Sequence, residues 1–283
     1  MKLNVSLNIL ILILAVSTAE AKMSASTSAV GQNKTNIAIP KKPEEKLFSS
    51  IISLSSSSNM YKEESPDRES SVDLLLLPSL KISQDASLTL KTIATQTAKQ
   101  DEKVSFSNTS LTLGLAGPKW EHRNLSTGFS FAGIAPTNTE SREKDSFRGG
   151  ASLGTKLVWA PAPVTLAYAI AGTRNFHEYT LSSEGSPNIQ YSVTQSLNAE
   201  LTLGQWGLSA EGLYRYSWTY RNFSRQSYAS SFGISYAFND SWSVSTGVEN
   251  SLGPLFKANG RDTNIRVFDQ NQSQINLGLT FTN

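Results

Sequence analysis

The sequence contains no cysteine and is poor in both charged and apolar residues. Its 283 residues include 0 Cys, which excludes disulfides, thiolate metal sites and thiol nucleophiles. Charged residues make up 17% and hydrophobic residues 39%, below the roughly 25% and 45–50% of ordinary globular proteins. Such a composition disfavours a compact α/β core. The formal net charge of +2 is too small to indicate a nucleic-acid partner.

Long apolar runs are confined to the start of the chain. Lys2, the run Ile9–Val16 and the small-x-small triplet Ala19–Ala21 together predict a secretory signal peptide over residues 1–21. An N-terminal membrane anchor is the alternative. No later segment has about 18 consecutive apolar residues, so no transmembrane helix is predicted. Residues 22–46 are polar, which predicts a flexible segment that either stays outside the domain or threads into it.

From residue 47 to residue 283 the apolar residues recur with a period of two. The pattern predicts about twelve strands of roughly 11–15 residues, whereas ordinary strands have about 5–6 and membrane-spanning strands need about 9–11 within the apolar band. The expected strands are Leu47–Asn59, Val72–Ser83, Ser87–Thr97, Val104–Leu115, Asn124–Ala135, Phe147–Trp159, Val164–Phe176, Ile189–Leu203, Trp206–Tyr220, Arg225–Phe238, Trp242–Leu252 and Arg266–Phe281.

The predicted connections alternate between short turns and longer polar loops. The short ones fall near Gln84–Ala86, Gly117–Glu121, Ala160–Pro163, Gly204–Gln205 and Asn239–Ser241. This alternation is typical of a transmembrane β-barrel. We therefore predict an all-β fold, an antiparallel up-and-down barrel of about twelve strands, in which an even strand count brings both termini to the short-turn side.

The aromatic residues gather near the predicted strand ends. Amphipathic rings prefer the membrane–water interface, so we expect an interfacial girdle formed by Trp120, Trp159, Trp206, Trp218, Phe238, Trp242 and Phe281. The alternative is a set of scattered core aromatics, which would not explain why most of them stand beside the short turns.

The opposite strand faces carry small, polar and charged residues and are predicted to line the lumen. The charged members are Asp73, Lys81, Lys91, Arg148, Lys156, Glu200, Glu211, Arg215 and Glu249. Their mixed signs fit either a weakly selective narrow pore or an interior closed by salt bridges. Leu75 and Leu77 break the pattern, because they are apolar on the inward face. They indicate either a locally packed lumen or an apolar patch that guides a solute, and Pro78 predicts an irregularity in the strand.

With this architecture the sequence resembles the outer-membrane β-barrel proteins of Gram-negative bacteria. The resemblance covers the signal peptide and residues 47–281. It includes the alternating final strand Ile275-x-Leu277-x-Leu279-x-Phe281, although two residues follow the terminal aromatic. It implies integral insertion in outer-membrane lipid with both termini periplasmic, and recognition by the barrel assembly machinery.

Catalytic and metal-binding patterns are missing from the sequence. Only 2 His are present, and neither stands in a phospholipase-like motif. His177 beside Glu178 near the predicted rim is a weak indication of an omptin-type protease. No phosphate-binding loop or metal cluster is apparent, so no enzyme activity, cofactor or metal is expected.

Three functions remain open at this stage. The favoured one is a porin-like channel for passive passage of small solutes, because long two-faced strands enclose a small-residue, mixed-charge interior. The second is a non-conducting structural or adhesion barrel, plugged by its own side chains or by residues 22–46. The third is a membrane hydrolase that acts as a phospholipase or a protease.

Overall fold

The computed structural model describes residues 47–59, 69–97, 104–255 and 273–283. The predicted signal peptide (1–21) and polar segment (22–46) lie outside the described residues. Within the described residues, no helix is long and apolar enough to span a membrane. The helical turns there are the 3₁₀ turn η1 (Glu121–Arg123) and the short helix α2 (Thr139–Glu143).

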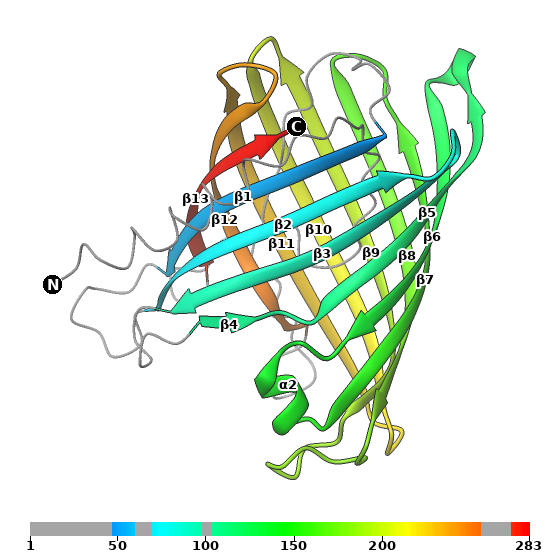
Figure 1. Cartoon of the computed structure of the whole chain (residues 1–283), viewed down its shortest axis with the longest axis vertical. Coiled ribbons are helices and arrows are strands. Elements are labelled where there is room, and N and C mark those ends of the chain that lie inside the picture. Colours follow the sequence, from blue (N-terminus) through cyan, green and yellow to red (C-terminus); the bar gives the residue numbers. More distant parts are fainter. Residues whose placement is uncertain (1–46, 60–68, 98–103, 256–272) are drawn as a thin grey trace, which may run out of the picture.

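Antiparallel strands in the described residues form one closed sheet (Figure 1). The ring runs β2-β1-β13-β12-β11-β10-β9-β8-β7-β6-β5-β3, and pairing between β2 and β3 closes it. The strands are β1 (Phe48–Asn59), β2 (Ser70–Lys81), β3 (Ala86–Thr97), β4 (Val104–Phe106), β5 (Thr109–Trp120), β6 (Leu125–Ala135), β7 (Phe147–Trp159), β8 (Val164–His177), β9 (Ile189–Leu203), β10 (Trp206–Thr219), β11 (Ser224–Ala237), β12 (Trp242–Pro254) and β13 (Ser273–Thr282). The predicted twelve-stranded barrel is confirmed.

The three-residue strand β4 and the strand β5 occupy the same position in the ring, beside β3. Both strands pair with β3, β4 through Ala94↔Phe106 and β5 through Lys91↔Ser110. The pairing shifts by one residue between them, which is the signature of a bulge. Ser107 fills the gap, since its N–H donates to the Ile93 carbonyl at 2.8 Å. The single strand predicted over Val104–Leu115 is therefore one interrupted strand that continues to Trp120.

The turn predicted at Gly117–Glu121 is placed too early. Gly117 and Pro118 lie inside β5, and the chain reverses at η1 and Asn124 instead. The register of β5 against β6 shifts between Ala116 and Lys119. A bulge of this kind accommodates proline, because the residue has no N–H to contribute to the ladder. Pro78 has a related effect in β2, whose pairing with β3 is interrupted between Leu76 and Ser79.

Two of the short turns show why the sequence reverses at these positions. Gly204 has φ +63 in the two-residue connection between β9 and β10, the left-handed conformation that glycine adopts without strain. Between β11 and β12, the Asn239 side-chain oxygen accepts hydrogen bonds from the N–H groups of Ser241 and Trp242, both at 2.9 Å. This is an Asx turn.

The two faces of the barrel differ in chemistry. Large apolar side chains are exposed on the outer face, as in Leu153 (56% exposed), Leu197 (56%) and Leu277 (59%). Inward positions carry hydroxyl groups that bond from strand to strand, for example Ser53 with Thr280 at 3.0 Å. A closed ring leaves no unpaired edge, and an apolar outer belt is suited to lipid. The period of two in the sequence therefore places polar residues inside and apolar residues outside.

Candidate channel lumen

A cavity of about 820 Å³ lies inside the barrel toward its long-loop end. Its walls come from β3 and β5–β9, with single contributions from β2, β10 and β11 and with loop residues around α2. Among the described strands, β1, β12 and β13 contribute none of the lining. The cavity is therefore off-centre in the barrel. Hydroxyl and amide side chains dominate it: Ser107, Asn108, Ser110, Thr112, Ser130, Ser152, Thr173, Asn175, Ser192 and Thr194.

Charged side chains project into the lumen from opposite walls. Glu200, Glu211 and Glu249 belong to β9, β10 and β12, whereas Lys91 and Lys156 belong to β3 and β7. Glu211 interacts electrostatically with Lys91, Lys156 and Glu249, and Glu200 interacts with Lys156. The acidic groups thus lie on β9, β10 and β12 and the lysines on β7 and β3. Only β8 separates the strands of Glu200 and Lys156, whereas Glu211 and Lys91 lie farther apart around the ring.

The Lys91–Glu211 interaction crosses the middle of the barrel. Strands β3 and β10 are six positions apart in either direction around the ring, so they are opposite each other. Lys91 and Glu211 therefore interact electrostatically across the lumen. Arg215 also lines the cavity, and its Nε donates to Thr194 Oγ1 at 3.3 Å.

Of the nine charged residues predicted in the lumen, Lys91 and Arg215 line this cavity, and Arg148 does not point inward at all. The pairing of β7 with β8 shifts between Phe147 and Gly149, and the extra residue of this bulge reverses the inside–outside alternation. Phe147 is consequently buried (5% exposed) against the cavity. Arg148 instead forms an exposed ion pair with Glu178.

Asp73 and Lys81 lie on the inner face of β2, away from the cavity lining. Asp73 is 2% exposed and accepts a hydrogen bond from Thr95 Oγ1 at 2.5 Å. Lys81 is the last residue of β2, and its backbone N–H donates to the Leu47 carbonyl at 2.7 Å. Asp73 thus belongs to the inner wall near the start of β2, and Lys81 belongs to it at the end of β2.

The two inward leucines of β2 are buried against other apolar side chains. Leu75 and Leu77 form a buried apolar cluster with Ile51 and Ile93, all 7–8% exposed. Leu77 and Ile93 also reach the edge of the cavity. This cluster lies on β1–β3, so that part of the inner wall is apolar whereas the β5–β9 part is polar.

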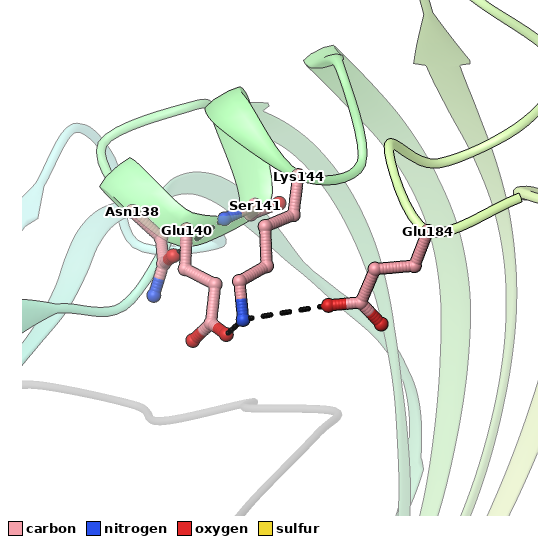
Figure 2. A network of polar contacts seen from close by, with 5 residues as sticks. All are labelled: Asn138, Glu140, Ser141, Lys144 and Glu184. Carbon is pink, nitrogen blue, oxygen red and sulfur yellow. Dashed lines mark hydrogen bonds and ion pairs between the residues drawn. The ribbon is translucent and has the colours of Figure 1, made fainter. Parts of the chain in front are cut away.

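The β6–β7 loop and the β8–β9 loop both border the cavity, and we call the two together the loop plate. In the β6–β7 loop, helix α2 is capped by Asn138, whose side-chain oxygen accepts from the Ser141 N–H at 2.7 Å. Figure 2 shows Lys144 lying between two carboxylates, Glu140 at 2.6 Å and Glu184 at 3.7 Å. The hydrogen bond with Glu140 raises the pKa of Lys144. The lysine thereby joins the β6–β7 loop to the β8–β9 loop.

Asn188 fixes three loops to one another. Its side-chain NH₂ donates to the carbonyls of Asp145 at 2.7 Å and Tyr179 at 2.9 Å. Its backbone N–H donates to the Thr180 carbonyl, and its own carbonyl accepts from the Tyr220 N–H at 3.1 Å. The residue is 5% exposed. A buried side chain with both donors in use makes the cap over the cavity an ordered structure.

His177 and Glu178, the pair that weakly indicated a protease, do not act on one site. The His177 ring packs edge-on against Phe147 at 5.4 Å and Tyr220 at 5.7 Å. Glu178 receives a hydrogen bond from Arg148, which holds the pKa of that carboxyl below its usual range. One residue is part of an aromatic cluster at the cavity and the other is part of a surface ion pair, so they provide no acid–base couple.

The expected girdle residues stand at strand ends on the outer face. Six of them are 38–54% exposed: Trp120, Trp159, Trp206, Trp218, Phe238 and Trp242. Trp242 contacts Phe281 with ring centroids 5.0 Å apart at the short-turn end. Trp218 contacts Tyr216 at 4.4 Å at the opposite end. Two levels of aromatic residues thus border the apolar belt.

Sequence reasoning missed five charged residues of the cavity: Glu140, Lys144, Asp145, Glu184 and Arg225. Arg225 is the second residue of β11 and the first of the predicted strand Arg225–Phe238. The other four lie in loop regions, and a polar loop carries no periodicity that shows which way it folds. Strand parity could have found Arg225, since it is two residues from Ser227, the partner of Arg215.

Among the described residues, no cluster of three or more His, Asp or Glu side chains could hold a metal ion.

Comparison with known proteins finds similar structures but no similar sequences. No family model and no curated protein sequence matches the chain. The KdgM porin is 10% identical with a TM-score of 0.49, covering 82% of this chain and 98% of that one. A loop L8 deletion mutant of OmpT, an outer-membrane protein of Vibrio cholerae, is 8% identical with a TM-score of 0.46, covering 83% and 98%. The fold assignment therefore rests on the strand pairing, the apolar outer belt and the polar interior described above, and on these grounds the chain has the fold of the outer-membrane β-barrel proteins.

Proposed function

We propose that the protein is a bacterial outer-membrane channel through which small hydrophilic solutes pass passively. The long-loop end with α2 would face the outside, and both termini would be periplasmic. The outer belt would contact membrane lipid, and the final alternating strand would be the part that the assembly machinery recognises.

The observation that carries this proposal is the state of the lumen charges. Lys156, Glu200 and Glu211 interact at a distance, but no ion pair joins them within 4.0 Å. An interior closed by salt bridges would require direct pairs, because isolated charges in a dry interior are strongly unfavourable. Separated charges in an interior whose strands also carry hydroxyl groups are compatible with water, and water in the lumen is what a diffusion channel needs.

Single-channel recording in planar bilayers tests the proposal. The refolded, purified protein should give reproducible steps, and Glu211→Gln should shift its selectivity toward anions because an acidic group of the lumen is lost. Lys119→Gln, an exposed change near the short-turn end of β5, is the control that should leave selectivity unchanged. Heat-dependent migration in SDS verifies that each sample is folded.

A deletion of residues 22–46 separates the channel from a plugged barrel. A folded wild-type barrel without conductance would overturn the proposal. If the deletion variant alone conducted, the barrel would be plugged by its N-terminal segment. If neither form conducted, a structural or adhesion role would replace the channel.

A further inference from the structure

Two arginines lie side by side on the inner wall of β10 and β11. Arg215 pairs with Ser227 and Ser217 pairs with Arg225, so the two arginines are diagonal neighbours on one face of the sheet. Diagonal positions are roughly 7–8 Å apart, within reach of long side chains. Both residues line the cavity. Two positive groups therefore line the same cavity side by side.

Neither guanidinium has a carboxylate partner among the residues that the structure describes. No ion pair among the described residues involves Arg215 or Arg225, and the Arg215 contact with Thr194 uses a neutral hydroxyl. The nearest acidic residue along β10 is Glu211, with the inward Leu213 between it and Arg215. Its electrostatic partners are Lys91, Glu249 and Lys156. Each guanidinium has five N–H donors, most of which remain available to a ligand.

The described strand residues next to the arginines add neutral hydroxyls to the wall and no acid. Ser192 and Thr194 line the cavity on β9, opposite Ser217 and Arg215 in the register. The acidic lining residues Glu140, Asp145 and Glu184 are instead on the loop plate. An anion that enters past the plate would meet these carboxylates first, which disfavours large polyanions and permits small ones.

We propose that Arg215 and Arg225 form a binding site for the carboxylate group of a small organic acid inside the lumen. The planar guanidinium fork matches the two oxygens of a carboxylate and binds them with charge-assisted hydrogen bonds. A bound carboxylate also relieves the repulsion between two adjacent cations. The inference rests on the proposed function in one respect only, namely that the solute reaches a water-filled lumen.

Isothermal titration calorimetry with sodium succinate tests the site on the full-length, detergent-solubilised barrel, whether or not it conducts. Succinate should bind the wild type, and uncharged succinamide should not. Arg215→Gln and Arg225→Gln should each raise the dissociation constant about tenfold, and the double variant about a hundredfold. Lysine at either position keeps the charge but loses the fork, so it should give an intermediate loss.

Arg221→Gln is the matched control at the same end of the barrel, since Arg221 lies in the β10–β11 turn and does not line the cavity. Arg123→Gln at the short-turn end is the second control. Equal binding of succinate by wild type and double variant, equal binding of succinate and succinamide by wild type, or an equal loss in Arg221→Gln would each overturn the inference. Succinate binding by a non-conducting barrel would overturn the channel and leave this site standing.

Discussion

Replacing Asn188 by Asp is expected to loosen the loops that cover the cavity. The substitution keeps the shape of the side chain but removes its donors. At this position the NH₂ group faces the carbonyls of Asp145 and Tyr179 at 2.7 and 2.9 Å. An aspartate oxygen in its place would lose both hydrogen bonds and would repel the two carbonyls.

The magnitude follows from the two lost hydrogen bonds. Each contributes about 0.5–1.5 kcal/mol net, so the loops should become about 1–3 kcal/mol easier to open before any repulsion is added. A change of 1.4 kcal/mol is a factor of ten, so local opening should increase on the order of tenfold to a hundredfold. Hydrogen exchange measures this opening directly. The diagnostic amides are those of Glu178, which donates to the Ser146 carbonyl, and Ser183, which donates to the Lys144 carbonyl.

The matched control is the same substitution at Asn239. There the side-chain oxygen accepts from the N–H groups of Ser241 and Trp242, and an aspartate can accept equally well. Asn239→Asp should therefore leave exchange in its turn unchanged. Unaltered exchange at Glu178 and Ser183 in Asn188→Asp would refute the role given to Asn188. Equal acceleration in both variants would show that the added charge, and not the lost donors, is responsible.

Three further outcomes are expected. Gly247→Ala should destabilise the barrel by about 1–3 kcal/mol, because the added Cβ would lie 2.4 Å from the backbone oxygen of Phe232. Gly212→Ala is the control and should be neutral or stabilising, since its Cβ would meet no atom within 4 Å. Denaturant unfolding in detergent should show the difference in stability between the two variants. The lowered pKa of Glu178 means that its pairing with Arg148 stabilises the β8–β9 loop above the ordinary carboxyl pKa and is lost as pH falls through the lowered value. Exchange in residues 178–188 should thus accelerate in acid, and Arg148→Gln should weaken that acid response. The raised pKa of Lys144 acts in the opposite direction, since its contribution is complete below the ordinary lysine pKa and is lost as pH rises through the raised value; Lys144→Met should abolish an alkaline increase in exchange at residues 139–143, and an unchanged alkaline response would contradict the link.

The strand pattern was predictable because the outer face of a membrane barrel is apolar along its whole length and most of the inner face is polar. The boundaries of β7 and β9, Phe147–Trp159 and Ile189–Leu203, agree with the predicted strands, since long alternating runs end at Pro, Gly or charged clusters. A bulge adds one residue to a strand, so the inside–outside alternation of side chains is reversed beyond it. Arg148 was assigned to the lumen from the alternation of β7, but the extra residue before Gly149 turns Phe147 inward instead.

The arrangement of the site was less predictable than its composition. Lys91 and Glu211 were both expected in the lumen, yet nothing in the sequence indicates that they face each other. That relation depends on ring closure, which places β3 opposite β10. The position of Lys144 between Glu140 and Glu184 likewise depends on how two loops fold together. Local patterns identify faces of strands, whereas contacts across a barrel arise from its closure.

The off-centre cavity makes the entrance sensitive to what binds at one end of the molecule. Because α2 and the neighbouring β8–β9 loop supply part of the lining, a macromolecule that binds this loop plate would obstruct the entrance to the cavity. A binder attached at the short turns, such as the Asx turn at Asn239, would touch none of the described lining residues. The loop plate is therefore the natural place to attach an engineered lid, a blocking antibody fragment or a reporter whose signal changes when a solute enters.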